Sequence, residues 1–158
     1  MERKVQYILN ELHEVISDFL APYDVTCYLG TDFSYYWVSE TIEYTVLVSE
    51  RQDALFQNFV DTRYPDIHAP IFLWSLLHEL GHHETDDYFT EEAHIIFDEY
   101  KATLRPELDK DVIEYYNIPD EATATNWAYL FLRDNTEKVS EFWNKIKPLL
   151  EQLHTCID

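Results

Sequence analysis

The sequence predicts an α+β fold with an N-terminal helix, a small three-stranded sheet and then a helical region. Three observations predict this class. Apolar residues recur at helical spacing through residues 5–20, and residues 25–48 are rich in β-branched and aromatic side chains. From residue 53 the helical spacing returns and continues almost to the end of the chain. One helix, a run of strands and a run of helices together indicate α+β architecture.

The first helix has one apolar face and is expected to end at Pro22, because proline does not continue a helix. Its apolar face is formed by Val5, Ile8, Leu9, Leu12, Ile16, Phe19 and Leu20. Three short strands are then expected over residues 25–29, 35–38 and 45–48, separated by the polar breaks at 30–32 and 39–40. We expect these strands to pair as a meander.

The remaining helices are placed by their apolar spacing and by their start and stop signals. Pro70 can occupy the first position of one of them, and Thr90 is expected to cap another, which stops before Pro106. A turn is expected at Tyr64-Pro65-Asp66, and a kink is possible at Pro148 in the last helix. The predicted helical ranges are 53–63, 70–84, 91–104, a short helix near 108–115, 120–132 and 136–153.

Composition favours one globular domain covering residues 1–158. Apolar residues make up 46% of the chain, which is enough for a core, so its acidity does not indicate disorder. The net charge of −20 repels phosphate backbones and anionic lipids. We therefore expect no direct binding to nucleic acid or to membranes.

The chain is expected to be cytoplasmic. Its N-terminus lacks the apolar stretch and cleavage site of a signal peptide, and it contains no run of 18 apolar residues. Cys27 and Cys156 lie far apart and form no CxxC pair, so reduced thiols are expected.

The segment His78-Glu79-Leu80-Gly81-His82 carries the chemistry, on the helix predicted for residues 70–84. Histidines four residues apart lie on one helix face, where both imidazoles can bind one zinc ion. Glu79 can accept a proton from a zinc-bound water and pass it to a leaving amine. Gly81 costs about 1 kcal/mol relative to alanine inside a helix. We therefore expect something, such as a strand or the substrate, to pass close to it.

A catalytic zinc site needs a third protein ligand. The metzincin pattern would require glycine at position 85 and histidine at 88, where this chain has Thr85 and Tyr88. The inverted HxxEH pattern is also absent. His83 points about 100° away from its neighbour His82 on the helix, so a role outside the ligand set is favoured. The third ligand must come from elsewhere in the chain.

Glu121 is the preferred third ligand. It lies in the first turn of the helix predicted for residues 120–132, and its own face carries the small residues Ala124, Thr125 and Ala128. Small residues let this helix lie close to the histidine helix, as a short Glu side chain reaching a metal requires.

Other residues remain candidates. His94 could be brought back to the metal by a chain reversal after the histidine helix. Tyr115 and Tyr116 are candidates for stabilising an oxyanion, and a carboxylate that orients the imidazoles is expected as well. The lesser options for the third ligand are Asp98, Glu99 and Asp120.

The run from Leu76 to His83 resembles the active-site helix of gluzincins, in particular that of the ImmA/IrrE-like metallopeptidases of phages and mobile elements. Those proteins often read HELGHH and continue with an acidic helix of the form ExEANxFA. Residues 121–128, EATATNWA, are similar to that helix, with Thr123 in place of its second acid and Thr125 in place of its Asn. The resemblance implies a zinc-dependent endopeptidase whose target is a repressor or another regulatory protein.

Three functions are therefore considered. The leading one is a zinc metallopeptidase with His78, His82 and Glu121 as ligands and Glu79 as general base. The second is a SprT-like protease with His94 as third ligand, although such enzymes act at DNA and the charge of −20 opposes this. The third is a non-catalytic, acidic zincin-like binding module. A protein or peptide substrate is the expected partner, and the sequence does not indicate an oligomeric state.

Overall fold

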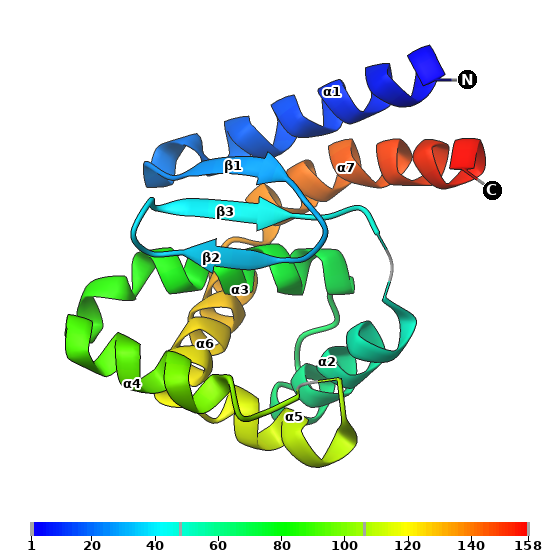
Figure 1. Cartoon of the computed structure of the whole chain (residues 1–158). Helices are drawn as coiled ribbons and strands as arrows, with labels where there is room; N and C mark the ends of the chain where they lie inside the picture. Colours follow the sequence, from blue (N-terminus) through cyan, green and yellow to red (C-terminus); the bar gives the residue numbers. More distant parts are fainter. Residues whose placement is uncertain (1, 48, 106, 158) are drawn as a thin grey trace. The chain divides into compact units, whose positions relative to one another are not determined.

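A computed structural model describes residues 2–47, 49–105 and 107–157, and it confirms the α+β class (Figure 1). The chain divides into two compact units. One unit combines Met1–Val46 with Asn135–Asp158, and the other is Leu47–Asp134. Each unit is described separately below, and a single domain over the whole chain stays a prediction.

In the first unit, helices α1 (Glu2–Leu20) and α7 (Thr136–Ile157) pack side by side (Figure 1). The apolar face predicted for the first helix is largely buried, with Leu12 and Ile16 fully inaccessible. The ring of Phe19 stacks on Phe142 of α7 with centroids 4.0 Å apart. Pro22 lies in a short 3-10 turn after α1, as its position predicts, and α7 continues through Pro148.

The sheet of this unit contains β1 (Thr26–Leu29), β2 (Ser34–Tyr36) and β3 (Thr41–Tyr44) in the order β1-β3-β2. Strand β3 is central, parallel to β1 and antiparallel to β2. The predicted meander is therefore wrong. Strand β3 is the most buried of the three, which agrees with its position between the other two.

The third strand was also predicted at the wrong place. It begins at Thr41, whereas the sequence pattern favoured residues 45–48, of which Val48 lies outside the described residues. The prediction placed the strand after Glu43, because a carboxylate is unusual in a central strand. Here it is buried and accepts hydrogen bonds from the hydroxyls of Tyr28 and Tyr36 and from the backbone amides of Thr31 and Asp32.

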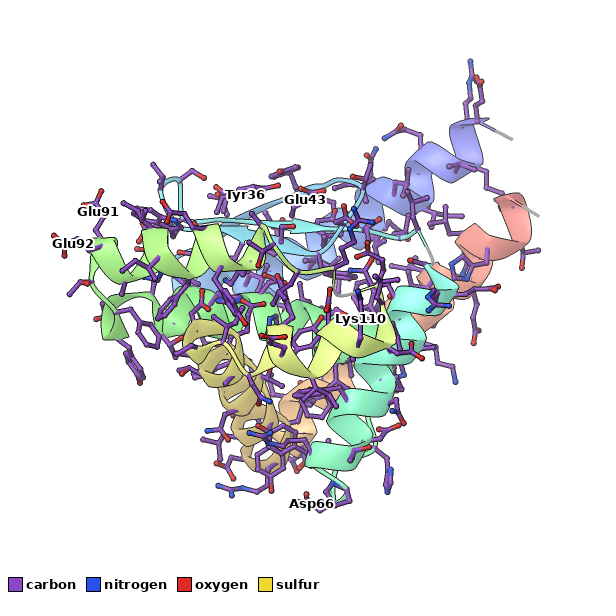
Figure 2. All side chains as sticks on the ribbon, turned by 60° about the horizontal axis from the view of Figure 1, so that its bottom comes forward. Tyr36, Glu43, Asp66, Glu91, Glu92 and Lys110 are labelled. Carbon is purple, nitrogen blue, oxygen red and sulfur yellow. The ribbon has the colours of Figure 1, made fainter. Side chains whose placement is uncertain are left out.

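These bonds tie all three strands together at one point, and Tyr36 and Glu43 can be seen on the sheet in Figure 2. Although burial alone would raise the pKa of Glu43, the donors around its carboxylate outweigh that effect and hold the pKa below its ordinary value. Glu43 is therefore a structural carboxylate with its bonding capacity already used within the sheet.

The second unit is helical. It contains α2 (Glu50–Arg63), α3 (Ile71–Glu84), α4 (Glu91–Lys101), α5 (Asp109–Tyr116) and α6 (Pro119–Asp134), with a 3-10 turn at Asp86–Tyr88. Helix α3 crosses α6 and packs closely on it (Figure 1). The turn at Tyr64–Asp66 is confirmed, whereas Pro70 is the residue that precedes α3 and not its first helical residue.

Helix α4 begins as its sequence predicts. The hydroxyl of Thr90 accepts a hydrogen bond from the backbone amide of Ala93 at 3.2 Å. The acidic first-turn residues Glu91 and Glu92 are exposed at this end of the helix (Figure 2), where negative charge is favoured. The cap therefore defines the start of α4, whose last residue is Lys101.

Two sequence expectations concern the chain as a whole. Cys27 and Cys156 are free thiols, as expected. Within the described ranges, no helix is both long enough and apolar enough to cross a membrane.

Candidate metal centre

Helix α3 is the platform of the centre. Every residue from Phe72 to Gly81 is buried, so this stretch of the helix presents no exposed face, whereas the turn from His82 to Glu84 is partly exposed. The rings of His78 and His82 lie on one face with centroids 4.7 Å apart and planes at 88° to each other. The four-residue spacing therefore gives the geometry that the sequence predicts.

Glu121 of α6 completes the cluster. Its Oε1 lies 3.2 Å from His78 Nε2, and its Oε2 lies 2.6 Å from His82 Nε2. One ligand atom from each of the three residues lies within 4.8 Å of the others, so the group could hold a metal ion. Ligand atoms about 2.0–2.2 Å from a tetrahedral ion are roughly 3.3–3.6 Å apart. The 3.2 Å separation between Glu121 and His78 is close to that spacing, whereas the 2.6 Å contact with His82 is a hydrogen-bonding distance that has to lengthen for a metal to bind. The exposed fractions of the side chains are 4% for His78, 14% for His82 and 5% for Glu121.

The close approach of α6 explains Gly81. A Cβ atom at this position would clash with the backbone carbonyl of Ala124 and would lie 3.1 Å from its Cα. The expected close neighbour is thus the backbone of α6, and neither a strand nor a substrate is needed to account for the glycine. Ala124, Thr125 and Ala128 are all buried at this contact, as the small face of the predicted helix indicates.

Thr125 orients the first histidine. Its hydroxyl donates to the backbone carbonyl of Glu121 at 2.9 Å, as it can do from one turn further along α6. Having used its only proton, this oxygen can accept from His78 Nδ1, which lies 2.9 Å away. Nδ1 then carries the proton of the imidazole and Nε2 keeps its lone pair for a metal. A carboxylate was expected in this role, and the structure places a threonine there.

Thr125→Val is expected to weaken binding of a divalent metal by roughly 10- to 100-fold, since the imidazole loses the acceptor that fixes its tautomer. The measurement is a zinc titration in competition with a chromophoric chelator. Thr123→Val is the matched control, because Thr123 makes the same kind of bond to a backbone carbonyl on the same helix, at 2.7 Å to Pro119. Equal zinc affinity in both variants would contradict the orienting role.

Burial and neighbouring charges shift the pKa values of Glu121, His82 and Glu79. Burial alone would raise the pKa of Glu121, but His82 and His78 hold it well below its ordinary value. Burial would lower the pKa of His82, yet the carboxylates of Glu121 and Glu79 raise it to about 9. Glu79 differs from Glu121, because burial raises its pKa despite the nearby histidines. The surroundings thus shift the pKa values of these two buried carboxylates in opposite directions.

No family model matches this chain. Comparisons with curated proteins and with solved structures also found no match. The similarity to ImmA/IrrE-like metallopeptidases therefore remains a resemblance of motifs, and the geometry of the centre carries the functional argument.

The other predicted ligands lie elsewhere. His94 Nε2 lies 2.9 Å from the backbone carbonyl of Asp86 and 3.3 Å from its carboxylate, so it bonds within the turn before α4. Asp98 and Glu99 are exposed on α4. Asp120 is buried beside Glu121, but its carboxylate pairs with Lys101 at 2.6 Å. None of these four belongs to the cluster that could hold a metal.

Tyr116 borders the centre. Its ring lies edge-on to His78 at 5.8 Å and stacks on Phe56 at 4.7 Å, while Tyr115 contacts Tyr116 from the same helix end. Burial, followed by the carboxylate of Glu121, raises the pKa of both phenols. Both hydroxyls therefore stay protonated at neutral pH and can serve as hydrogen-bond donors.

A hollow of about 420 Å³ lies between α2 and α5. Leu55, Phe59, Val112 and Ile113 supply its apolar lining. Phe59 contacts Tyr116 at 5.2 Å, but the residues that line the hollow do not include the three metal-ligand candidates. The hollow is thus a neighbour of the centre and not the centre itself.

Sequence reasoning missed the contacts of two residues. Thr125 was noticed only for its small size, although its spacing of four from Glu121 is the usual one for bonding back to a carbonyl. Lys101 was not considered at all. Its Nζ lies 2.6 Å from Asp120 Oδ2 and 3.0 Å from Glu121 Oε2, and no local pattern at the end of α4 indicates that contact.

Proposed function

We propose that this chain is a zinc-dependent hydrolase that cleaves peptide bonds, with Glu79 as its general base. The observation that carries the proposal is the buried His78/His82/Glu121 cluster with Glu79 on the same helix. Two imidazoles and one carboxylate are ligands that zinc accepts, and three protein ligands leave one coordination position open for catalysis.

A zinc ion at this centre would lower the pKa of a bound water and polarise the substrate carbonyl. The carboxylate of Glu79 accepts the proton of the attacking water and delivers it to the departing amine. Its raised pKa suits this role, because a group that accepts and then releases a proton works best when its pKa approaches the working pH. The neutral phenol of Tyr116 or Tyr115 is available to donate to the oxygen that gains negative charge.

A peptide substrate is proposed because of the resemblance to the ImmA/IrrE-like enzymes, which would make a regulatory protein the natural target. The charge of −20 favours a cationic substrate segment and disfavours direct contact with nucleic acid or anionic lipid. A SprT-like arrangement receives no support from the position of His94.

Zinc stoichiometry tests the ligand set. His82→Ala and Glu121→Ala are each expected to lose tightly bound zinc, because each leaves only two protein ligands. His94→Ala should retain a full equivalent, since its ring bonds to Asp86. The measurement is metal content after dialysis, with circular dichroism to confirm folding. Stoichiometric zinc in a folded Glu121→Ala variant, or its loss from His94→Ala, would overturn the assignment.

A further inference from the structure

The last residue of α4 reaches the metal centre from outside the ligand set. Lys101 Nζ lies 2.6 Å from Asp120 Oδ2 and 3.0 Å from Glu121 Oε2. The lysine side chain is only 17% exposed, and the two carboxylates are 8% and 5% exposed. Burying these charges is costly unless they are paired, so this contact belongs to the folded centre and is not a surface ion pair.

The ammonium acts on a metal-ligand oxygen directly. Glu121 Oε1 faces His78, whereas Oε2 lies 2.6 Å from His82 Nε2 and also accepts from Lys101. A divalent cation at the centre and the ammonium of Lys101 are therefore stabilised by the same carboxylate. Two cations that share one anion repel each other, so each reduces the benefit that the other gains.

The ammonium of Lys101 also compensates the negative charge of the carboxylates around it. Asp120, Glu121 and Glu79 are all buried within this part of the helical unit. In the metal-free protein, Lys101 is a positive charge that compensates Asp120 and Glu121, both of which it contacts. Without Lys101, Asp120 would lose this cationic partner and Glu121 would keep only the two imidazoles, so the two adjacent buried carboxylates would repel each other more strongly.

We propose that Lys101 is a built-in counter-ion of this centre. Its ammonium keeps Glu121 and Asp120 in place before the metal arrives and holds the affinity for a divalent cation below the level that the three ligands alone would give. The centre is then assembled without metal, and metal binding is reversible. This inference rests on the proposed metal site, but it goes beyond the ligand set and the reaction.

A merely structural role for Lys101 predicts a different result. If the lysine only anchored α4 to α6, its loss would destabilise the metal-free and metal-bound forms together, and zinc affinity would stay constant or fall. If Lys101 is a counter-ion, its loss should change the stability of the metal-free protein and its affinity for zinc in opposite directions. The metal-free protein becomes less stable, and zinc binds more tightly because a repelling charge has been removed.

The test uses full-length Lys101→Met with Lys101→Arg and Lys110→Met as controls. Arg keeps the charge, and Lys110 is an exposed lysine of α5 (Figure 2). Lys101→Met should bind zinc roughly 10- to 100-fold more tightly in a chelator competition, and its metal-free form should melt at a lower temperature. Both controls should stay close to the unmodified protein. Unchanged or weaker zinc binding by Lys101→Met would overturn the inference.

A charge-balanced pair covers the case in which metal-free Lys101→Met does not fold. Lys101→Met/Asp120→Asn loses one cation and one anion, and it is compared with Asp120→Asn alone, so the two differ only in the ammonium. The double variant should again bind zinc more tightly, and equal affinities would reject the counter-ion. If the unmodified chain bound no zinc, the proposed metal site itself would fail. Zinc binding by the unmodified chain without this affinity difference would reject the counter-ion role of Lys101 and leave the proposed metal site standing.

Discussion

Glu79→Gln is expected to lower the rate of peptide-bond hydrolysis by about 10²–10⁴-fold while zinc stays bound. Gln has nearly the shape of Glu, so the buried site keeps its packing, but an amide cannot accept the proton of the attacking water. The side chain does not belong to the group that could hold the metal, so the ligand set is unaffected. The effect should therefore fall on the chemical step.

The measurement is cleavage of a pool of internally quenched peptides, with zinc content determined on the same samples. Glu84→Gln is the matched control, because Glu84 lies at the end of the same helix and outside the metal cluster. Equal turnover by Glu79→Gln and the unmodified chain would remove the general base from the mechanism. Absence of turnover in a zinc-loaded unmodified chain, with every peptide tested, would instead favour the non-catalytic binding module.

The local parts of the centre could be predicted from the sequence. His78 and His82 are one helical turn apart, and helical periodicity alone places them on one face. Glu121 could be reached by one further step, because small residues on its helix face indicate a close neighbour. The pattern along one helix places the two histidines on one face, and the pattern along another indicates a close neighbour for the Glu121 helix. Zinc ligation by these three residues stays a prediction.

The non-local parts could not be predicted. The contact of Lys101 with Glu121 joins two helices whose relative placement no periodicity specifies. Strand β3 was misplaced for a related reason. Glu43 is tolerated in a central strand only because Tyr28, Tyr36 and the loop after β1 donate to its carboxylate. A buried charge is acceptable when its partners surround it, and those partners become visible only in three dimensions.

Gly81→Ala is expected to destabilise the helical unit by about 1–3 kcal/mol, although alanine is the better helix former by about 1 kcal/mol. The added methyl group would meet the carbonyl of Ala124 and atoms of the α6 backbone 3.1 Å away. A backbone cannot rotate aside as a side chain can, so α3 and α6 must separate. Since Glu121 and Thr125 are carried by α6, zinc affinity should fall as well.

The measurements are urea unfolding followed by circular dichroism and a zinc titration. Ala54→Gly, at an exposed position of α2, calibrates the helix-propensity contribution on its own. The double variant Gly81→Ala/Ala124→Gly sharpens the argument. Removing the side chain of Ala124 should not rescue the protein, because the atoms that the new methyl group meets are backbone atoms. Rescue by the second change, or a stabilised Gly81→Ala, would show that this helix contact does not depend on the glycine and does not hold Glu121 against the histidines.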